Sequence, residues 1–173
     1  MQATANTAEK TVADVTTDQY LTFSLAGEEY GVDILTVQEV KVWTRVTSLP
    51  NTPTYIKGVL NLRGVIVPII DLRSRFEMEA VDYSETTVIV ILKLAVDNRD
   101  KIIGLVVDAV SDVLDIPRSA QKPVDSFEVH SKSEAITGVA SVNNKLVIML
   151  DTTRLLTTGD LNAVEQDIAM ATN

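Results

Sequence analysis

The residue types that carry most enzymatic chemistry are scarce in this chain. It has no cysteine, which excludes a thiolate nucleophile, a disulfide and a cysteine-ligated metal. The single histidine, His130, stands in a polar run without a second histidine at ligand spacing, as is typical of a solvent-exposed imidazole. No serine lies in a nucleophile motif, and the seven glycines form no phosphate-binding loop. The sequence therefore predicts no catalytic, cofactor or metal site.

Four aspartates are prominent because each ends a predicted strand. Asp33 matches Asp108, and Asp71 matches Asp151, in an internal repeat of the sequence. Acid–base catalysis would need carboxylates that converge in a pocket. An aspartate at a strand end instead accepts hydrogen bonds from nearby backbone amides and caps the following turn. We therefore interpret all four as structural corners.

Glu39 and Arg63 are the charged residues whose positions indicate binding. Glu39 shares a predicted strand face with Val37, and Arg63 lies at a predicted hairpin tip. A surface salt bridge would also explain both, but arginine is enriched at interface hot spots because its planar guanidinium forms paired hydrogen bonds while its stem packs. We predict an interaction role for this pair. Of the aromatic residues that could anchor an interface, we expect Trp43 in the core and Phe127 at the surface.

Alternating apolar and polar residues predict a protein built mainly of β-strands. The exception is Asp160 to Ala171, where apolar residues recur at helical spacing after a candidate cap and predict a short C-terminal helix. Prolines and serines between Asp115 and Glu134 predict a long surface loop. The predicted strands are Gln19–Leu25, Glu29–Asp33, Val37–Trp43, Ile56–Leu62, Val65–Asp71, Thr86–Val96, Lys101–Val107, Ile136–Val142 and Lys145–Asp151.

The sequence contains an internal duplication. Ile56-Lys57-Gly58-Val59 matches Ile136-Thr137-Gly138-Val139, and Val32-Asp33 matches Val107-Asp108 upstream. About five strands in each copy suit a small barrel, which removes sheet edges by closing. Units of about 65 residues are marginal alone, so the two should share a core. We predict an all-β fold of two five-stranded, SH3-like β-barrel subdomains with a shared hydrophobic core.

The two copies diverge at one hairpin. Asn61-Leu62-Arg63-Gly64 in the first copy becomes Ser141-Val142-Asn143-Asn144 in the second, so Arg63 is not needed to form the turn. The same patterns predict the domain organisation. We expect a flexible tail over 1–16, one domain over 17–157, and a helix and tail over 158–173. Within the domain, the first barrel is expected at roughly 30–90, and the second at 91–156 together with the first strand, 19–29.

Composition limits the partners. The formal charge of -9, without a compensating basic stripe, disfavours nucleic acid and anionic membranes. No segment approaches the roughly 18 apolar residues of a membrane span, and the first sixteen residues lack the features of a secretory signal. We therefore expect a cytoplasmic protein with protein partners. An enzyme with a cryptic site and a barrel that binds a small molecule in its interior are the rival interpretations.

Several runs of residues resemble the CheW coupling proteins of bacterial chemotaxis. The resemblance covers about Gln19 to Leu156, and the Asn-Leu-Arg-Gly hairpin is its most specific part. It implies two five-stranded barrels, no enzymatic activity and no cofactor. The matching runs are Glu28–Leu35, Val37–Val40, Tyr55–Arg73 and Gly104–Leu114.

The resemblance also implies partners and sites. CheW-like proteins bind the regulatory domain of the histidine kinase CheA and the cytoplasmic tips of methyl-accepting chemoreceptors, in signalling arrays that can hold further CheW copies. The expected location is therefore the inner face of the membrane, without insertion into it. The residues expected in a receptor-facing groove between the barrels are Val37, Glu39, Arg63, Val110 and Val113. The residues expected to contact the kinase or the array are Gly58, Lys122 and Phe127.

Overall fold

The computed structural model describes residues 16–124, 134–156 and 158–172. Residues 1–15 of the predicted tail lie outside this range. The strands are β1 Thr17–Leu25, β2 Glu28–Asp33, β3 Val37–Val42, β4 Ile56–Leu62, β5 Val65–Asp71, β6 Val88–Val96, β7 Arg99–Val107, β8 Ala109–Pro117, β9 Gln121–Pro123, β10 Ile136–Val142 and β11 Lys145–Leu150. The helices are α2 Leu72–Arg75 and α3 Thr158–Thr172, and the 3-10 turns are η1 Ile34–Thr36, η2 Arg118–Ala120 and η4 Thr152–Arg154.

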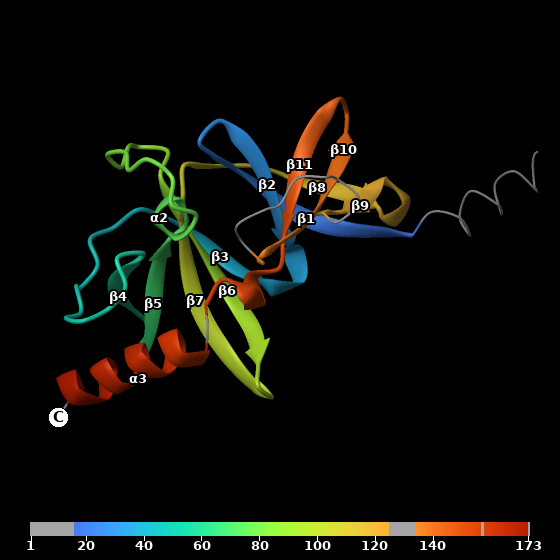
Figure 1. The fold of residues 1–173 in the computed structure, drawn as a ribbon. Helices are drawn as coiled ribbons and strands as arrows, with labels where there is room; N and C mark the ends of the chain where they lie inside the picture. The colour runs from blue at the N-terminus through green and yellow to red at the C-terminus, as the bar shows by residue number, and fades with distance from the viewer. Residues whose placement is uncertain (1–15, 125–133, 157, 173) are drawn as a thin grey trace, which may run out of the picture.

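The strands form two sheets (Figure 1), which confirms the predicted β-rich fold. The first, here called sheet A, has the order β8-β1-β2-β11-β10-β9, and the second, sheet B, has the order β3-β6-β7-β5-β4. Within the described residues, neither barrel is closed by a continuous ladder. In sheet B, a single bridge from Thr47 to Val59 links the chain after β3 to the far edge strand, β4.

The two sequence copies exchange strands between the sheets. The first hairpin, β1–β2, lies in sheet A, whereas β3, β4 and β5 of the same copy lie in sheet B. The second copy does the reverse, since β6–β7 lies in sheet B and its later strands lie in sheet A. The chain changes sheets directly after Asp33 and after Val107. The repeat-matched aspartates therefore mark the two crossovers.

The strand exchange corrects the predicted subdomain boundaries. Sheet B is built from residues between Val37 and Val107, and sheet A from 17–33 and from Ala109 onward. A boundary between 90 and 91 would cut through β6, Val88–Val96. The predicted loop is also partly wrong, because β8 continues to Pro117 and the short strand β9 pairs with β10. Proline is tolerated at the end of such an edge strand, so Pro123 hides β9 from a sequence-based prediction.

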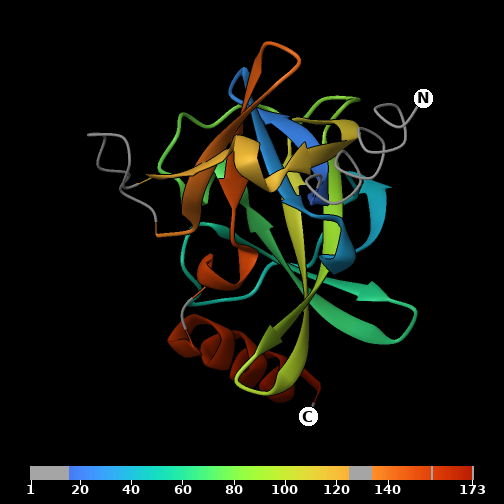
Figure 2. The same cartoon turned by 90° about the vertical axis from the view of Figure 1, so that its right-hand side faces the viewer.

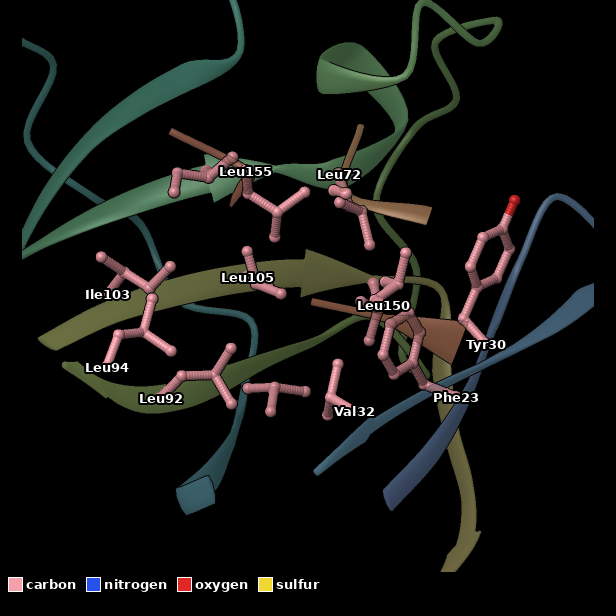
Figure 3. Packing of buried hydrophobic residues seen from close by; sticks show 14 of the residues in the cluster. Phe23, Tyr30, Val32, Leu72, Leu92, Leu94, Ile103, Leu105, Leu150 and Leu155 are labelled. Atoms are coloured by element: carbon pink, nitrogen blue, oxygen red, sulfur yellow. The ribbon is translucent and has the colours of Figure 1, made fainter. Parts of the chain in front are cut away.

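One hydrophobic core joins the two sheets, as predicted. Phe23 and Val32 of sheet A are fully buried in the same cluster as Leu92 and Leu105 of sheet B. Figure 3 shows these side chains pointing toward one another from both sheets. Each large aliphatic side chain contributes about 1.5–3 kcal/mol to folding when it leaves water. Because side chains of both sheets are buried in one cluster, each sheet is stabilised by the presence of the other.

The interiors of the two curled sheets are filled differently. Ile89, Ile91 and Val106 pack inside sheet B. Leu21 pairs with Val32 in the first copy, as Val88 pairs with Val107 in the second. Thr22 and Ser24 of sheet A therefore occupy the positions that Ile89 and Ile91 occupy in sheet B. The aliphatic cluster of sheet A is correspondingly smaller and consists of Ile116, Ala140, Val147 and Met149. Sheet A therefore has the weaker interior of its own.

The C-terminal helix α3 confirms the predicted short helix, although it begins at Thr158, before the predicted cap. Leu161 and Val164 are buried against the body. Glu165 forms an ion pair with Lys101 of sheet B. Asp160 accepts a hydrogen bond from Tyr55, whose pKa burial and this carboxylate raise to about 12. In two perpendicular views α3 lies at the opposite end of the molecule from the β10–β11 hairpin (Figures 1 and 2).

Candidate protein-binding surface

The prominent aspartates are engaged in local structure rather than gathered in a pocket. The carboxylate of Asp33 accepts a hydrogen bond from the amide of Leu35 at 2.9 Å, and Asp151 accepts one from Thr153 at 3.1 Å. Asp71 accepts from the amide of Ser74 at 3.2 Å and from the hydroxyl of Tyr83 at 2.5 Å. These contacts agree with the predicted corner roles.

The described residues hold no cluster of acidic or histidine side chains suited to a metal ion. Tyr83 does not supply an ionisable group either, because burial and the hydrogen bond to Asp71 raise its pKa. His130 and Phe127 lie outside the described residues.

A β-bulge places two of the predicted receptor-binding valines on one face of β8. Val110 pairs with Phe23 and Val113 pairs with Leu21, because the register shifts at the intervening Ser111. Residues three apart in a regular strand would point to opposite faces. The bulge instead turns both valines toward the shared core. Val110 packs against the core cluster, whereas Val113 stays 45% exposed.

Strand β3 repeats this arrangement in sheet B. Val37 pairs with Leu92 and Val40 pairs with Val90, with a bulge at Gln38 between them. Both partners belong to the shared core, so the two valines also face it. Val37 is partly buried and Val40 is exposed. Each sheet thus presents one edge strand with an inner, half-buried valine and an outer, exposed one.

The prediction missed Val40, although the sequence carried the signal for it. Val37-Gln38-Glu39-Val40 of the first copy has the same pattern as Val110-Ser111-Asp112-Val113 of the second. Extending the repeat alignment through the crossovers would have identified Val40 as the counterpart of Val113. Leu35, in η1 between β2 and β3, was also missed, and it is 86% exposed.

Glu39 and Arg63 form an ion pair, which is the surface salt bridge that the sequence offered as the alternative to an interaction role. Arg63 Nη2 donates to Glu39 Oε2 at 2.8 Å, and Lys41 Nζ lies 4.0 Å from the other carboxylate oxygen. β3 and β4 are opposite edges of sheet B, so this pair spans the opening of the curled sheet. The side chain of Arg63 remains 73% exposed, against 27% for Glu39. Glu39 therefore orients a guanidinium that is mostly open to a partner.

The backbone of Arg63 is unusual for an arginine. Leu62 pairs with Val65, so Arg63 and Gly64 form a two-residue turn, with φ angles of 51° and 89°. Such turns favour Asn and Gly, and an ordinary side chain in the left-handed region costs roughly 1–2 kcal/mol. The second copy has Asn143 at the matching position with a φ of 50°. Arg63 is thus present against the local conformational preference, which supports a role outside the turn.

Gly58 and Lys122, the predicted kinase or array contacts, lie in different sheets, each in a close contact between a glycine and a carbonyl that occurs in both copies. A Cβ atom on Gly58 would lie 2.0 Å from the carbonyl oxygen of Thr47, and one on Gly138 would lie 2.4 Å from that of Lys122. Because glycine has no Cβ atom, the backbone at Thr47 and at Lys122 can pass close to the bulges in β4 and β10. Gly58 therefore has a structural role whether or not it contacts a partner.

Trp43 is partly buried at the margin of the core inside sheet B. Its ring is tilted against that of Tyr83 with centroids 4.3 Å apart, and it packs on the cluster inside sheet B. The structure thus brings Glu39 and Arg63 together and sets Val37 and Val110 against one core. Gly58 and Lys122 lie on β4 and β9.

Comparison with known proteins decides the family. A model of the CheW-like domain matches residues 19–159. The chain belongs to the CheW-like family. The chemotaxis protein CheW of Klebsiella aerogenes is 40% identical over 159 residues, which are 92% of this chain and 93% of that protein. The CheW of Bacillus subtilis is 31% identical over 86% of this chain and 87% of its own length.

A solved structure supports the same assignment. The crystal structure of the scaffolding protein TtCheW from Thermoanaerobacter tengcongensis matches with a TM-score of 0.73 and 32% identity, over 84% of this chain and 96% of that one. The relatives that match are named as chemotaxis or scaffolding proteins and not as enzymes, and this chain belongs to the same family of chemotaxis coupling proteins. No helix among the described segments is long and apolar enough to cross a membrane.

Proposed function

We propose that this CheW-like protein couples the histidine kinase CheA to the cytoplasmic tips of methyl-accepting chemoreceptors in signalling arrays, in the cytoplasm at the inner face of the membrane. The observation that carries the proposal is the pair of bulged edge strands, β3 and β8. Each directs a half-buried and an exposed valine along the shared core. An apolar surface of this kind suits the packing of a helical hairpin.

The ion pair of Glu39 and Arg63 adds polar specificity to the receptor surface. Arg63 has donors to spare, because a guanidinium has five and Glu39 takes one of them in this geometry. A partner carboxylate or backbone carbonyl can therefore bind Arg63 without breaking the pair. The valines supply apolar contact area, and Arg63 supplies orientation.

The kinase and further CheW copies would then bind elsewhere on the molecule. Gly58 in sheet B and Lys122 in sheet A lie on the edge strands β4 and β9, and not on β3 or β8. An adaptor needs at least two faces, so that one partner can be held while the other changes. Coupling then arises from differential contacts, which bias the kinase between active and inactive states. Phe127 is part of this proposal from the sequence alone.

Receptor binding by β8 can be tested with two matched valine variants. We expect Val113→Lys to weaken binding of a purified receptor cytoplasmic fragment by roughly tenfold or more, because a charge replaces an apolar contact. Val81→Lys is the control, since Val81 is 48% exposed and Val113 45%, but Val81 lies in the connection between α2 and β6. Both variants should keep the thermal midpoint of the parent. Equal binding by the two variants would contradict the proposed surface.

A further inference from the structure

The two crossovers between the sheets differ, although they match in sequence. The chain passes from β2 to β3 through η1, where the carboxylate of Asp33 accepts a hydrogen bond from Leu35 of the same crossover. It passes from β7 to β8 at Asp108, whose carboxylate accepts a hydrogen bond from the amide of Ala26, in the turn between β1 and β2, at 2.9 Å. Asp33 thus stabilises its own turn, whereas Asp108 reaches another segment of the fold.

Arg73 ties the second crossover to the other sheet. Its Nε donates to Asp108 Oδ1 at 2.8 Å and its Nη2 donates to Asp108 Oδ2 at 2.6 Å, and Nη1 donates to the carbonyl of Glu79 at 3.1 Å. Arg73 belongs to α2, directly after β5 of sheet B, whereas Ala26 belongs to a hairpin of sheet A. The Asp108 carboxylate therefore links the β1–β2 hairpin of sheet A to helix α2, which directly follows β5 of sheet B.

The second crossover is well defined by these contacts. Both side chains are mostly buried, and a two-point bond between guanidinium and carboxylate fixes orientation as well as distance. The Arg73 hydrogen bonds hold the pKa of Asp108 below its ordinary value, so the carboxylate is ionised at neutral pH. The second copy has Thr153 where the first has Arg73, and the hydroxyl of Thr153 bonds to Asp151. The repeat therefore does not supply a matching arginine for Asp33.

The first crossover is held by local contacts alone. Ile34 of η1 is partly buried against the shared core and the hydroxyl of Thr36 donates to the carbonyl of Asp33 at 2.7 Å, whereas Leu35 is almost completely exposed. Short exposed segments at the end of a strand are the places where a hinge absorbs backbone change. The crossover at Asp108 is thus fixed, and the crossover at η1 is the one that can change its conformation.

We propose that Arg73 and Asp108 pin the two sheets at one crossover and so set the spacing between edge strands β3 and β8, while η1 is the crossover that adjusts. Arg73 and Asp108 are then positioning residues for the surface between these strands. The proposal concerns the geometry of the free protein and does not require that the proposed partners are correct.

The spacing can be measured directly because the chain has no cysteine of its own. Spin labels on Val42→Cys in β3 and Asp115→Cys in β8, both exposed positions, report the distance between the edge strands by electron–electron dipolar spectroscopy. We expect a narrow distance distribution in the labelled parent. Asp108→Asn should broaden it and shift its centre. Arg73→Lys, which keeps the charge but loses the two-point bond, should give an intermediate width and decides the question if Asp108→Asn does not fold.

The control variant removes another two-point contact between an arginine and an aspartate, which is more exposed and does not join the sheets. Arg118 bonds to both carboxylate oxygens of Asp18 at 3.1 and 3.3 Å, and both residues belong to the sheet A side. Asp18→Asn should leave the distance distribution of the parent unchanged. A parent-like distribution in folded Asp108→Asn or Arg73→Lys, whatever their thermal midpoints, would overturn the proposal, because the pair would then only stabilise the fold.

Discussion

Replacing Arg63 by asparagine separates the stability of the β4–β5 hairpin from its use in binding. Arg63 has a φ of 51°, and Asn143 has the same conformation in the matching turn of the second copy. Relief of the left-handed conformation should stabilise the turn by about 1 kcal/mol. Loss of the exposed ion pair with Glu39 should cost about 0.2–1 kcal/mol. The two effects nearly cancel, so the thermal midpoint of Arg63→Asn should stay within about 3 °C of the parent or rise.

The same substitution should damage binding far more than stability. A guanidinium at the centre of an interface commonly contributes about 2 kcal/mol or more, which is roughly thirtyfold in affinity. We therefore expect Arg63→Asn to fold normally and to bind a receptor cytoplasmic fragment at least about thirtyfold more weakly. Thermal unfolding by circular dichroism and binding by isothermal titration calorimetry measure the two quantities on one sample.

A converse variant controls for the turn. Asn143→Arg places arginine in the left-handed position of the second hairpin, where no interaction role is proposed, and should lower stability by about 1 kcal/mol. Its receptor affinity should equal that of the parent. A fall of many degrees in the midpoint of Arg63→Asn, with unchanged affinity of the folded fraction, would refute the reasoning and make Arg63 a structural residue.

Three further outcomes follow from the contacts. Gly58→Ala should lower the free energy of unfolding by about 2 kcal/mol or more, because its Cβ would meet the Thr47 carbonyl. Gly27→Ala, whose Cβ would lie in open space, should lower it by about 1 kcal/mol. Thermal unfolding of both variants measures the difference. The folded-state pKa of Asp108 is lowered, so the stability it adds over Asp108→Asn in urea titrations should be constant above about pH 5 and shrink as pH falls through that pKa. Backbone amides of β11 should exchange with solvent faster than those of β5, because sheet A has the weaker interior.

Each of these predictions can fail clearly. Equal midpoints for the two glycine variants would show that the chain after β3 can move away from Gly58. A constant difference between the parent and Asp108→Asn down to pH 2 would show that contact with Arg73 does not lower the pKa of Asp108. Slower exchange in β11 than in β5 would show that the shared core, and not the interior of each sheet, sets local stability.

The sequence was most informative where the physics is local. Strands followed from the period of two, and the hairpin turns from Arg63-Gly64 and Asn143-Asn144. The repeat predicted two similar sheets and a shared core. Beyond the first strand, which was expected with the second barrel, it gave no sign that whole hairpins are exchanged, because pairing partners are distant in sequence and the same hairpins can join either sheet. The Val-Asp corners marked the crossovers without indicating which sheet the chain enters.

The proposed binding surface was predictable in part for the same reason. Glu39 and Arg63 were found because charge at a hairpin tip and on a strand face is unusual, and the fold brings them together. Val40 was missed because its orientation depends on the bulge at Gln38, which no periodicity reveals. The contact between Arg73 and Asp108 was invisible, since it joins two elements through a tertiary geometry that local patterns do not encode.

The central claim is that this chain is a scaffold that makes kinase activity depend on receptors. Reconstitution tests it most directly: autophosphorylation of CheA is measured with receptor-containing membranes, with and without this protein. We predict that receptor ligand controls the kinase only when the protein is present, and that Val113→Lys restores little of this control. Full receptor control without the protein, or unchanged kinase activity after its addition, would contradict the claim.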